Sequence, residues 1–583
     1  MKLKILALSI PSALMMIAGC NKQTQTHLAV TYGASGIETI TYDGIVLESV
    51  KKYPSDKFYI GHMKTTDLTG ASKTIGDYGW GENNIGKRWD ADNKTWDYTF
   101  PWGSIRVQYQ QDGEALNVKV TESNRTDSGV ILYGASVVPF TLHFGQTPSN
   151  FSPGPYPAIS DNYTSPGVVA ANYRAGTALL VVPDAAKPLY AAYLRQPSAD
   201  AFAAVVSSTS LDNLASFQPH LDRRVMPGES DQFTMSLRLY NGKQPIQTVA
   251  ADAFNSWNQR WPSTLDWKDR RAIGAAYLAS SPAAGSTPDP ANPRRYFALA
   301  AASHIDIRTP EGLAILQQKV LGFAHGVVEN LRRLDGQGVV TWDIEGEQYP
   351  QETSYVCSPD QIATTAPEME SVIHDTSSPY VGMKLDDAYF KIIRTAGFRV
   401  GVCVRPQQFT QGGGSGAKQV QLSSNQIANE LIRKAKYAHD RWGATLFYVD
   451  SSVGSIGDVI DPGIVQTVSR ALPDSLLIPE ETTPRYYSFS AGFRSLLFHG
   501  DTGTPSVIYN YYPRAFSVVM INDVAPDRLK AARKALTESA RRGDILMVHA
   551  AYWQSNNSVV QDIYFDANAK ATTRASLATA KTN

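Results

Sequence analysis

The chain has 583 residues, which is more than one ordinary domain holds, so two large domains are expected. Lys plus Arg and Asp plus Glu both number 54, and a sequence without a basic excess argues against a nucleic-acid partner. Hydrophobic residues at 43 % and charged residues at 19 % are typical of a folded globular protein, and three cysteines are too few for a disulfide scaffold.

The first 20 residues have the pattern of a secretory leader, with two lysines, an apolar run over 5–17 and small residues before Cys20. The segment Ile17-Ala18-Gly19-Cys20 resembles the lipobox of bacterial lipoproteins, in which the cysteine is lipidated and becomes the first mature residue. We expect a lipoprotein signal peptide over 1–19 and a tether over 20–26. The protein would then be lipid-anchored in the bacterial cell envelope, at the outer membrane or a periplasmic face. The alternative is a plain signal peptide followed by a chance cysteine.

Residues 27–243 alternate apolar and polar side chains in short runs separated by turn residues. Such runs are Leu28–Tyr32, Ile105–Tyr109, Leu116–Val120 and Phe233–Leu239. Alternation with a period of two and one buried face is the signature of antiparallel strands, and helical periodicity is nearly absent. The sequence therefore predicts an N-terminal antiparallel β-sandwich over 27–243, followed by a linking helix within 244–265.

From residue 266 to 566, apolar strands alternate with longer amphipathic segments. Strands are expected at 272–280, 338–345, 398–405, 445–450, 475–480, 505–511, 516–522 and 544–550. Helices are expected at 310–334, 384–396, 424–442, 461–471 and 525–542. Strands joined by crossover helices form a parallel sheet, and eight of them in about 280 residues predict a C-terminal (β/α)8 TIM barrel. Residues 567–583 are expected to form a loose tail.

Polar residues follow several of these strands, and in such barrels the chemistry lies at the carboxyl ends of the strands. Alternation along strand three and strand four predicts that Arg405, Tyr448 and Asp450 face the barrel axis. Along strand two it predicts two opposite faces. The residues expected to face the axis are Thr341, Asp343 and Glu345, and those expected to face the helices are Val340, Trp342 and Ile344.

Carboxylates therefore gather at one rim of the predicted barrel. These are Asp343, Glu345, Asp450, Glu480 and Asp523. Converging carboxylates raise one another's pKa and so supply an acid and a base. Glycoside hydrolysis needs such a pair and neither a metal nor a cofactor, so a carbohydrate substrate is expected. Neighbouring strands lie about 4.8 Å apart, which brings Asp450 and Glu480 near the roughly 5–5.5 Å separation of a retaining pair.

The strand closing on Asp450, Glu480 on the next strand and Asp523 late in the barrel resemble (β/α)8-barrel glycoside hydrolases of the α-amylase and α-galactosidase type. Many of these enzymes also carry a β-sandwich in front of the barrel. The resemblance implies that Asp450 is the nucleophile, Glu480 the general acid/base and Asp523 a transition-state stabiliser. The chain departs from both patterns at Tyr448, where the amylase type places Arg and the galactosidase type Lys.

Some roles stay open at this point. Supporting or substrate-binding positions are expected at Asp343, Glu345, Arg405, Tyr448, Glu481 and Asp523. Glu481 is an alternative to Glu480 as the acid. A second class of function is a surface glycan-binding lipoprotein with an inactive barrel, in which binding would survive loss of either carboxylate. A third is a lyase or a metal-dependent barrel enzyme, revealed by an unsaturated product or by chelator sensitivity.

Replacing Cys20 by serine is expected to release the protein from the membrane fraction, because the thiol that would carry the lipid is lost. Fractionation of detergent-free extracts measures this, with the unaltered chain as control. Continued membrane retention of the Cys20→Ser protein would refute the lipoprotein interpretation.

Overall fold

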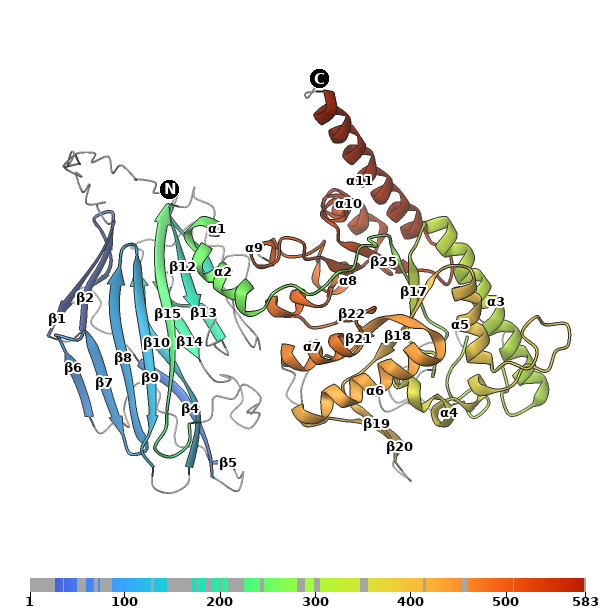
Figure 1. The fold of residues 1–583 in the computed structure, drawn as a ribbon, viewed down its shortest axis with the longest axis horizontal. Coiled ribbons are helices and arrows are strands. Elements are labelled where there is room, and N and C mark those ends of the chain that lie inside the picture. The colour runs from blue at the N-terminus through green and yellow to red at the C-terminus, as the bar shows by residue number, and fades with distance from the viewer. Residues whose placement is uncertain are drawn as a thin grey trace, which may run out of the picture.

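The computed structural model places an all-β part and an α/β barrel side by side along the long axis of the molecule (Figure 1). It describes residues 27–34, 36–49, 59–67, 72–73, 86–126, 130–143, 169–174, 177–183, 191–198, 201–207, 225–241, 246–279, 289–297, 305–346, 355–412, 416–452, 460–506 and 508–580. The predicted leader, the tether and Cys20 lie outside these ranges.

The described residues of the N-terminal part form three antiparallel sheets, as the alternating pattern predicts. The first has the order β1-β2-β3, with β1 Leu28–Gly33, β2 Gly36–Tyr42 and β3 Ile45–Ser49. The second has the order β13-β14-β10-β4-β5, with β13 Ala191–Ser198, β14 Ala201–Ser207, β10 Val130–His143, β4 Tyr59–Asp67 and β5 Ser72–Lys73. The third has the order β11-β12-β15-β9-β8-β7-β6, with β11 Val169–Arg174, β12 Thr177–Pro183, β15 Ser230–Asn241, β9 Ala115–Asn124, β8 Gly103–Asp112, β7 Thr95–Phe100 and β6 Gly86–Asp90.

The seven-stranded sheet shows why this sequence forms a sandwich. Along β8, Ile105, Val107 and Tyr109 are buried while Arg106 and Gln110 are exposed. One face of an antiparallel sheet thus packs on a core and the other stays polar.

The linker between the two parts packs on the barrel. It contains α1 Ile246–Val249 and α2 Ala251–Arg260. In α2, Phe254 and Trp257 are buried, and they form a cluster with Tyr511 and Tyr512. The indole Nε1 of Trp257 donates to the Tyr512 hydroxyl at 2.8 Å, and that hydroxyl donates to the Trp261 carbonyl at 3.0 Å.

The C-terminal part is an eight-stranded parallel sheet in the order β22-β21-β18-β17-β16-β25-β24-β23. Its strands are β16 Ile273–Ala276, β17 Gly338–Thr341, β18 Arg399–Val404, β21 Ala444–Val449, β22 Leu476–Pro479, β23 Gly492–Ser495, β24 Ser517–Met520 and β25 Ile545–His549. The Ala491 amide, next to β23, donates to the Leu477 carbonyl of β22 at 3.0 Å, so the sheet closes almost completely. The predicted TIM barrel is confirmed.

Helices surround this sheet (Figure 1). They are α3 Pro310–Leu334, α4 Ile362–Thr365, α5 Leu385–Thr395, α6 Ser424–Trp442, α7 Pro462–Ala471, α8 Leu496–His499, α9 Ile508–Tyr511, α10 Pro526–Arg542 and α11 Ser555–Ala580. The bounds of α3 match the prediction because the Thr309 hydroxyl accepts the Gly312 amide at 3.0 Å and Pro310 occupies the first turn. A hairpin of β19 Gln408–Gly412 and β20 Gly416–Val420 follows β18.

Two expectations need correction. The sixth strand is β23 and not 505–511, which contains α9. The apolar residues Ile508 and Tyr511 pack on the linker helix α2 instead of joining the sheet. The segment 567–583 was expected to be loose, whereas α11 continues through Ala580 and runs away from the barrel (Figure 1).

Apolar side chains fill the barrel on both sides of its wall. An outer cluster joins the strands to the helices, while an inner cluster occupies the barrel axis. The inner cluster includes Ile273, Ala275, Val340, Trp342, Cys403, Leu446, Tyr448, Ile478, Phe493 and Met547. Among the described helices, none is long and apolar enough to cross a membrane.

Replacing Tyr512 by phenylalanine is expected to lower the free energy of unfolding by about 1–3 kcal/mol, because it leaves the buried indole N–H of Trp257 unpaired. Urea unfolding followed by tryptophan fluorescence measures this. Tyr552→Phe is the matched control, since Tyr552 is 52 % exposed. Equal stability of the two variants would contradict the role of this contact.

Candidate active site

Asp450 is the first residue after β21, and its backbone continues the sheet. Its amide donates to the Val404 carbonyl of β18 at 3.0 Å. Its side chain is 11 % exposed, at the carboxyl end of the barrel where the residue pattern placed it.

Arg405 pairs with this carboxylate from the end of β18. Its Nε lies 2.7 Å and its Nη2 2.5 Å from Asp450 Oδ2. Both side chains are largely buried, so each charge depends mainly on the other for its compensation. The guanidinium therefore holds the carboxylate in one orientation. Arg405 thus lies beside Asp450 at the ends of β18 and β21.

Glu480 follows β22, the next strand, and is held in the same way. Its amide donates to the Val449 carbonyl at 3.1 Å, and its Oε2 accepts the Ser451 amide at 2.7 Å. Burial and, after it, the negative charge of Asp450 together raise the pKa of Glu480 to about 7. Two carboxyl groups from adjacent strands thus lie close together in different environments. Different environments give the two groups different pKa values, so one can act as an acid while the other is ionised.

Tyr448 lies below this pair in the barrel interior. Its ring centroid is 4.7 Å from that of Trp342 and 5.0 Å from that of Phe493. Burial raises the pKa of Tyr448 well above its ordinary value, and the Glu480 charge adds to this. Tyr448 is therefore a neutral neighbour of Glu480, where the α-amylase and α-galactosidase types would place a cation.

The expected orientation of strand two is wrong. Val340 and Trp342 lie in the inner cluster, whereas the Thr341 hydroxyl is 3.0 Å from the Tyr389 hydroxyl of α5, on the helix side. Strands of a parallel barrel are buried on both faces, so alternation does not distinguish the two faces. Trp342 is inside because its ring packs on Tyr448 and Tyr277.

Asp343 and Glu345 accordingly lie apart from the opening. Asp343 is fully buried, and its two carboxylate oxygens accept the amides of Leu278 and Ala279 at 2.8 and 2.7 Å, which fixes the turn after β16. Glu345 is 1 % exposed, and burial raises its pKa to about 8. Its Oε1 has no hydrogen-bond partner among the residues that the structure describes.

Asp523 lies after β24, at the same end of the barrel. Its two oxygens are 3.1 and 3.2 Å from His549 Nε2, and its side chain is 61 % exposed. The His549 ring is edge-on to Tyr277 and stacked on Tyr552. Glu481 is exposed, and its backbone amide donates to the Ser452 hydroxyl at 2.8 Å. This contact involves the backbone of Glu481, and no described contact directs its carboxylate toward Asp450.

Three residues at this end of the barrel have an uncommon backbone conformation. Cys357, Ser451 and Asp523 have φ values of 47°, 48° and 55°, in the left-handed region that residues other than glycine rarely adopt. Such conformations persist where surrounding contacts impose them, and they cluster at functional sites.

Two buried cysteines complete the surroundings of Asp450, and both are free thiols. Cys357 Sγ lies 4.0 Å from Asp450 Oδ2. Cys403 belongs to β18 and to the inner cluster. The sequence pattern gave Cys357 no role because it lies in a polar loop 93 positions from Asp450, where no local motif marks it.

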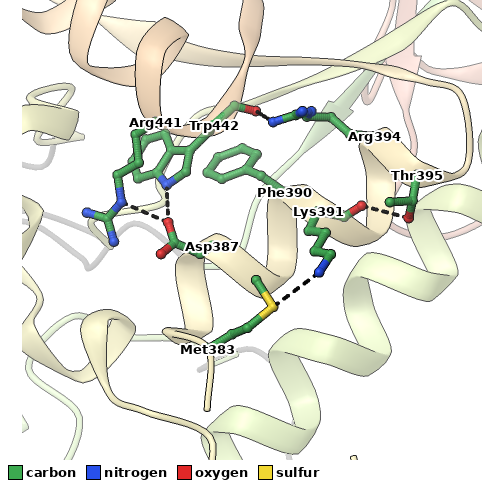
Figure 2. Close-up of a pocket in the computed structure, with 8 residues that line it drawn as sticks. All are labelled: Met383, Asp387, Phe390, Lys391, Arg394, Thr395, Arg441 and Trp442. Carbon is green, nitrogen blue, oxygen red and sulfur yellow. Dashed lines mark hydrogen bonds and ion pairs between the residues drawn. The ribbon is translucent and has the colours of Figure 1, made fainter. Parts of the chain in front are cut away.

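Cavities also lie away from this site. A cavity of about 480 Å³ is on the outer side of the barrel wall (Figure 2). It is lined by Met383, Asp387, Phe390, Lys391, Arg394, Thr395, Arg441 and Trp442. Arg394 donates to the Trp442 carbonyl at 3.0 Å, and this hydrogen bond bounds the cavity at the ends of α5 and α6. These ends precede β18 and β21, so the cavity lies away from the carboxyl ends where barrels carry chemistry. Another, of about 610 Å³, lies on the polar face of the seven-stranded sheet.

No protein-family model matches the chain, and no curated protein matches its sequence. Solved structures are similar at low identity. The α-N-acetylgalactosaminidase NagBb from Bifidobacterium bifidum, in complex with Gal-NHAc-DNJ, is 10 % identical over 93 % of this chain and 92 % of its own, with a TM-score of 0.48. The galactosidase domain of the α-galactosidase-sucrose kinase AgaSK is 11 % identical over 94 % and 80 %, with a TM-score of 0.41. A β-arabinopyranosidase is 10 % identical over 80 % and 68 %, with a TM-score of 0.33.

Replacing Asp450 by asparagine is expected to lower the pKa of Glu480 below its value of about 7, because a neighbouring negative charge is removed. The pKa should stay above the ordinary glutamate value, since burial remains. NMR titration of ¹³C-carboxyl-labelled glutamate measures this, with Glu480→Gln identifying the signal. An unchanged pKa would show that the two carboxyl groups do not interact.

Proposed function

We propose that the protein is a retaining glycoside hydrolase acting on an oligo- or polysaccharide. The observation that supports this most is the pairing of Asp450, held by Arg405, with Glu480, whose pKa is raised to about 7. Such a pair provides an anionic nucleophile and a protonated acid at the same pH.

In the first step, the protonated Glu480 gives its proton to the glycosidic oxygen as the bond from the anomeric carbon to that oxygen breaks. Asp450 attacks the anomeric carbon from the opposite face and forms a glycosyl ester. Arg405 binds Oδ2, so we assign the attack to Oδ1. The guanidinium also stabilises the Asp450 carboxylate when the glycosyl ester breaks in the second step.

In the second step, the ionised Glu480 takes a proton from water. The water oxygen bonds to the anomeric carbon as the ester bond to Asp450 breaks, which restores both carboxyl groups. Two inversions at one carbon retain its configuration.

The pKa of Glu480 sets the direction of the pH dependence. Below about pH 7 most of the enzyme holds the proton that the leaving group needs, and the rate should fall as the pH rises through that value. Glu481 is exposed and lacks such an environment, so we assign the acid to Glu480.

Sugar contacts are proposed for groups that follow β24 and β25, at the same end of the barrel. Tyr552 is half exposed and stacked on His549, so its ring is available to the apolar face of a sugar, and Asp523 can accept hydrogen bonds from hydroxyl groups. Asp343 and Glu345 would act as buried supports. Anchoring through Cys20 remains a proposal from the leader pattern.

The test uses the chain without the leader, beginning at Asn21, beside its Asp450→Asn and Glu481→Gln variants. Each is incubated with aryl glycosides and polysaccharides while NMR follows the anomeric protons. We expect product from the unaltered chain and from Glu481→Gln, and loss of activity by far more than tenfold in Asp450→Asn.

The first anomer formed should have the configuration of the substrate. Turnover by Asp450→Asn within tenfold of the unaltered chain would remove this residue from the nucleophile role. Binding of a glycan without product, unaffected by either carboxylate, would favour an inactive glycan-binding barrel.

A further inference from the structure

Two thiols and one carboxylate converge at the base of the carboxylate pair. The Sγ atoms of Cys357 and Cys403 and a carboxylate oxygen of Asp450 all lie within 4.8 Å of one another. Cys357 is fully buried, Cys403 is 1 % exposed and Asp450 is 8 % exposed. In the part of the chain that the structure describes, no other group of three such donors comes together in this way.

The backbone holds these donors in place. The Cys357 carbonyl accepts the Arg405 amide at 3.2 Å, which fixes the loop beside the end of β18. Cys357 adopts a φ of 47°, so its surroundings impose an uncommon conformation on a residue with a side chain. Cys403 comes from β18 itself, and Asp450 is tied to that strand through Val404. The three donors thus share one rigid support.

The spacing suits a tetrahedral metal ion. Zinc binds thiolate sulfur at about 2.3 Å and carboxylate oxygen at about 2.0–2.2 Å, so two such donors on one tetrahedral ion lie roughly 3.5–3.8 Å apart. The observed distance from Cys357 Sγ to Asp450 Oδ2 is 4.0 Å, and all three donor atoms lie within 4.8 Å of one another. The donors would therefore move together by up to about 1 Å to bind one ion. Three protein donors leave the fourth position open.

The local charges also balance. A divalent ion bound by two thiolates and one carboxylate carries a net charge of −1, and the guanidinium of Arg405 lies against the same carboxylate. Metals bind cysteine as the thiolate, so each thiol would release its proton when the metal binds. Several other ionisable groups interact electrostatically with the thiols: Arg405, Asp450, Glu345, Lys434, Tyr277 and Tyr448.

We propose that Cys357, Cys403 and Asp450 form a site for one thiophilic divalent metal ion such as Zn²⁺ or Cd²⁺. The ion would bind Oδ2 of the carboxylate that we assign as nucleophile and withdraw charge from its Oδ1, so metal binding would slow hydrolysis. This last consequence rests on the proposed function, whereas metal binding itself does not.

The test uses the full chain carrying Cys20→Ser, reduced, so that Cys357 and Cys403 are its only thiols. It is titrated with Cd²⁺ while the ultraviolet absorption of the thiolate–cadmium bond is followed. We expect saturation at one ion per chain. Cys357→Ser and Cys403→Ser should each weaken cadmium binding at least tenfold and reduce the absorption band at saturation. Asp450→Asn should also weaken binding at least tenfold, but the full absorption band should still form at saturation because both thiols remain. Asp562→Asn, which removes an exposed carboxylate on α11, is the matched control and should bind as before.

X-ray absorption of the unaltered site adds a measurement that does not depend on a variant folding. It should show two sulfur neighbours and one or two light-atom neighbours around the ion. Absence of the band at one equivalent, unchanged affinity in Asp450→Asn, or a spectrum with fewer than two sulfurs would overturn the proposal. These metal-binding measurements need no glycoside substrate, so they test the metal site separately from the proposed hydrolase activity.

Discussion

The buried ion pair between Arg405 and Asp450 is the interaction on which the rest of the site depends. Removing two charges from water carries a penalty of several kcal/mol per ion, so such a pair persists only with good geometry and further hydrogen bonds. Here one guanidinium approaches a single carboxylate oxygen with two nitrogens. Removing either partner would leave the other charge buried, which typically costs about 3–5 kcal/mol.

The barrel supplies this geometry by extending its backbone hydrogen bonds past the strands. The amides of Asp450 and Glu480 donate to Val404 and Val449, the last residues of β18 and β21, on neighbouring strands. Arg405, Asp450 and Glu480 therefore lie side by side at the ends of three neighbouring strands, β18, β21 and β22. The charge of Asp450 then acts on Glu480 and raises its pKa, while the loop bearing Cys357 is held by the Arg405 amide. The acidity of one carboxyl group thus depends on the orientation of its neighbour.

Sequence patterns predicted the elements with strong local signals. The helices α3 and α6 begin at capping residues and end before residues in the left-handed conformation, and their predicted bounds match the structure. The inward positions of Arg405, Tyr448 and Asp450 also follow from alternation. The sixth strand was missed because β23, with the sequence Gly-Phe-Arg-Ser, is four residues long and carries one large apolar side chain.

Other features depend on long-range contacts that no local pattern contains. Strand two is apolar on both faces, so only the packing of Trp342 on Tyr448 decides which side is inside. The approach of Cys357 to Asp450 joins a loop to a distant strand end. The pairing of Asp523 with His549 likewise connects two separate strand ends, and neither residue alone indicated it.

The central claim is that Asp450 becomes covalently attached to the sugar. The most direct test treats the protein with a 2-deoxy-2-fluoro glycoside that has an activated leaving group, using the sugar identified from the substrate panel, and then applies mass spectrometry. The account predicts a mass increase of one fluoroglycosyl group per chain, carried by the peptide that contains Asp450. A label on another residue, or hydrolysis with inversion and no labelled protein, would contradict it.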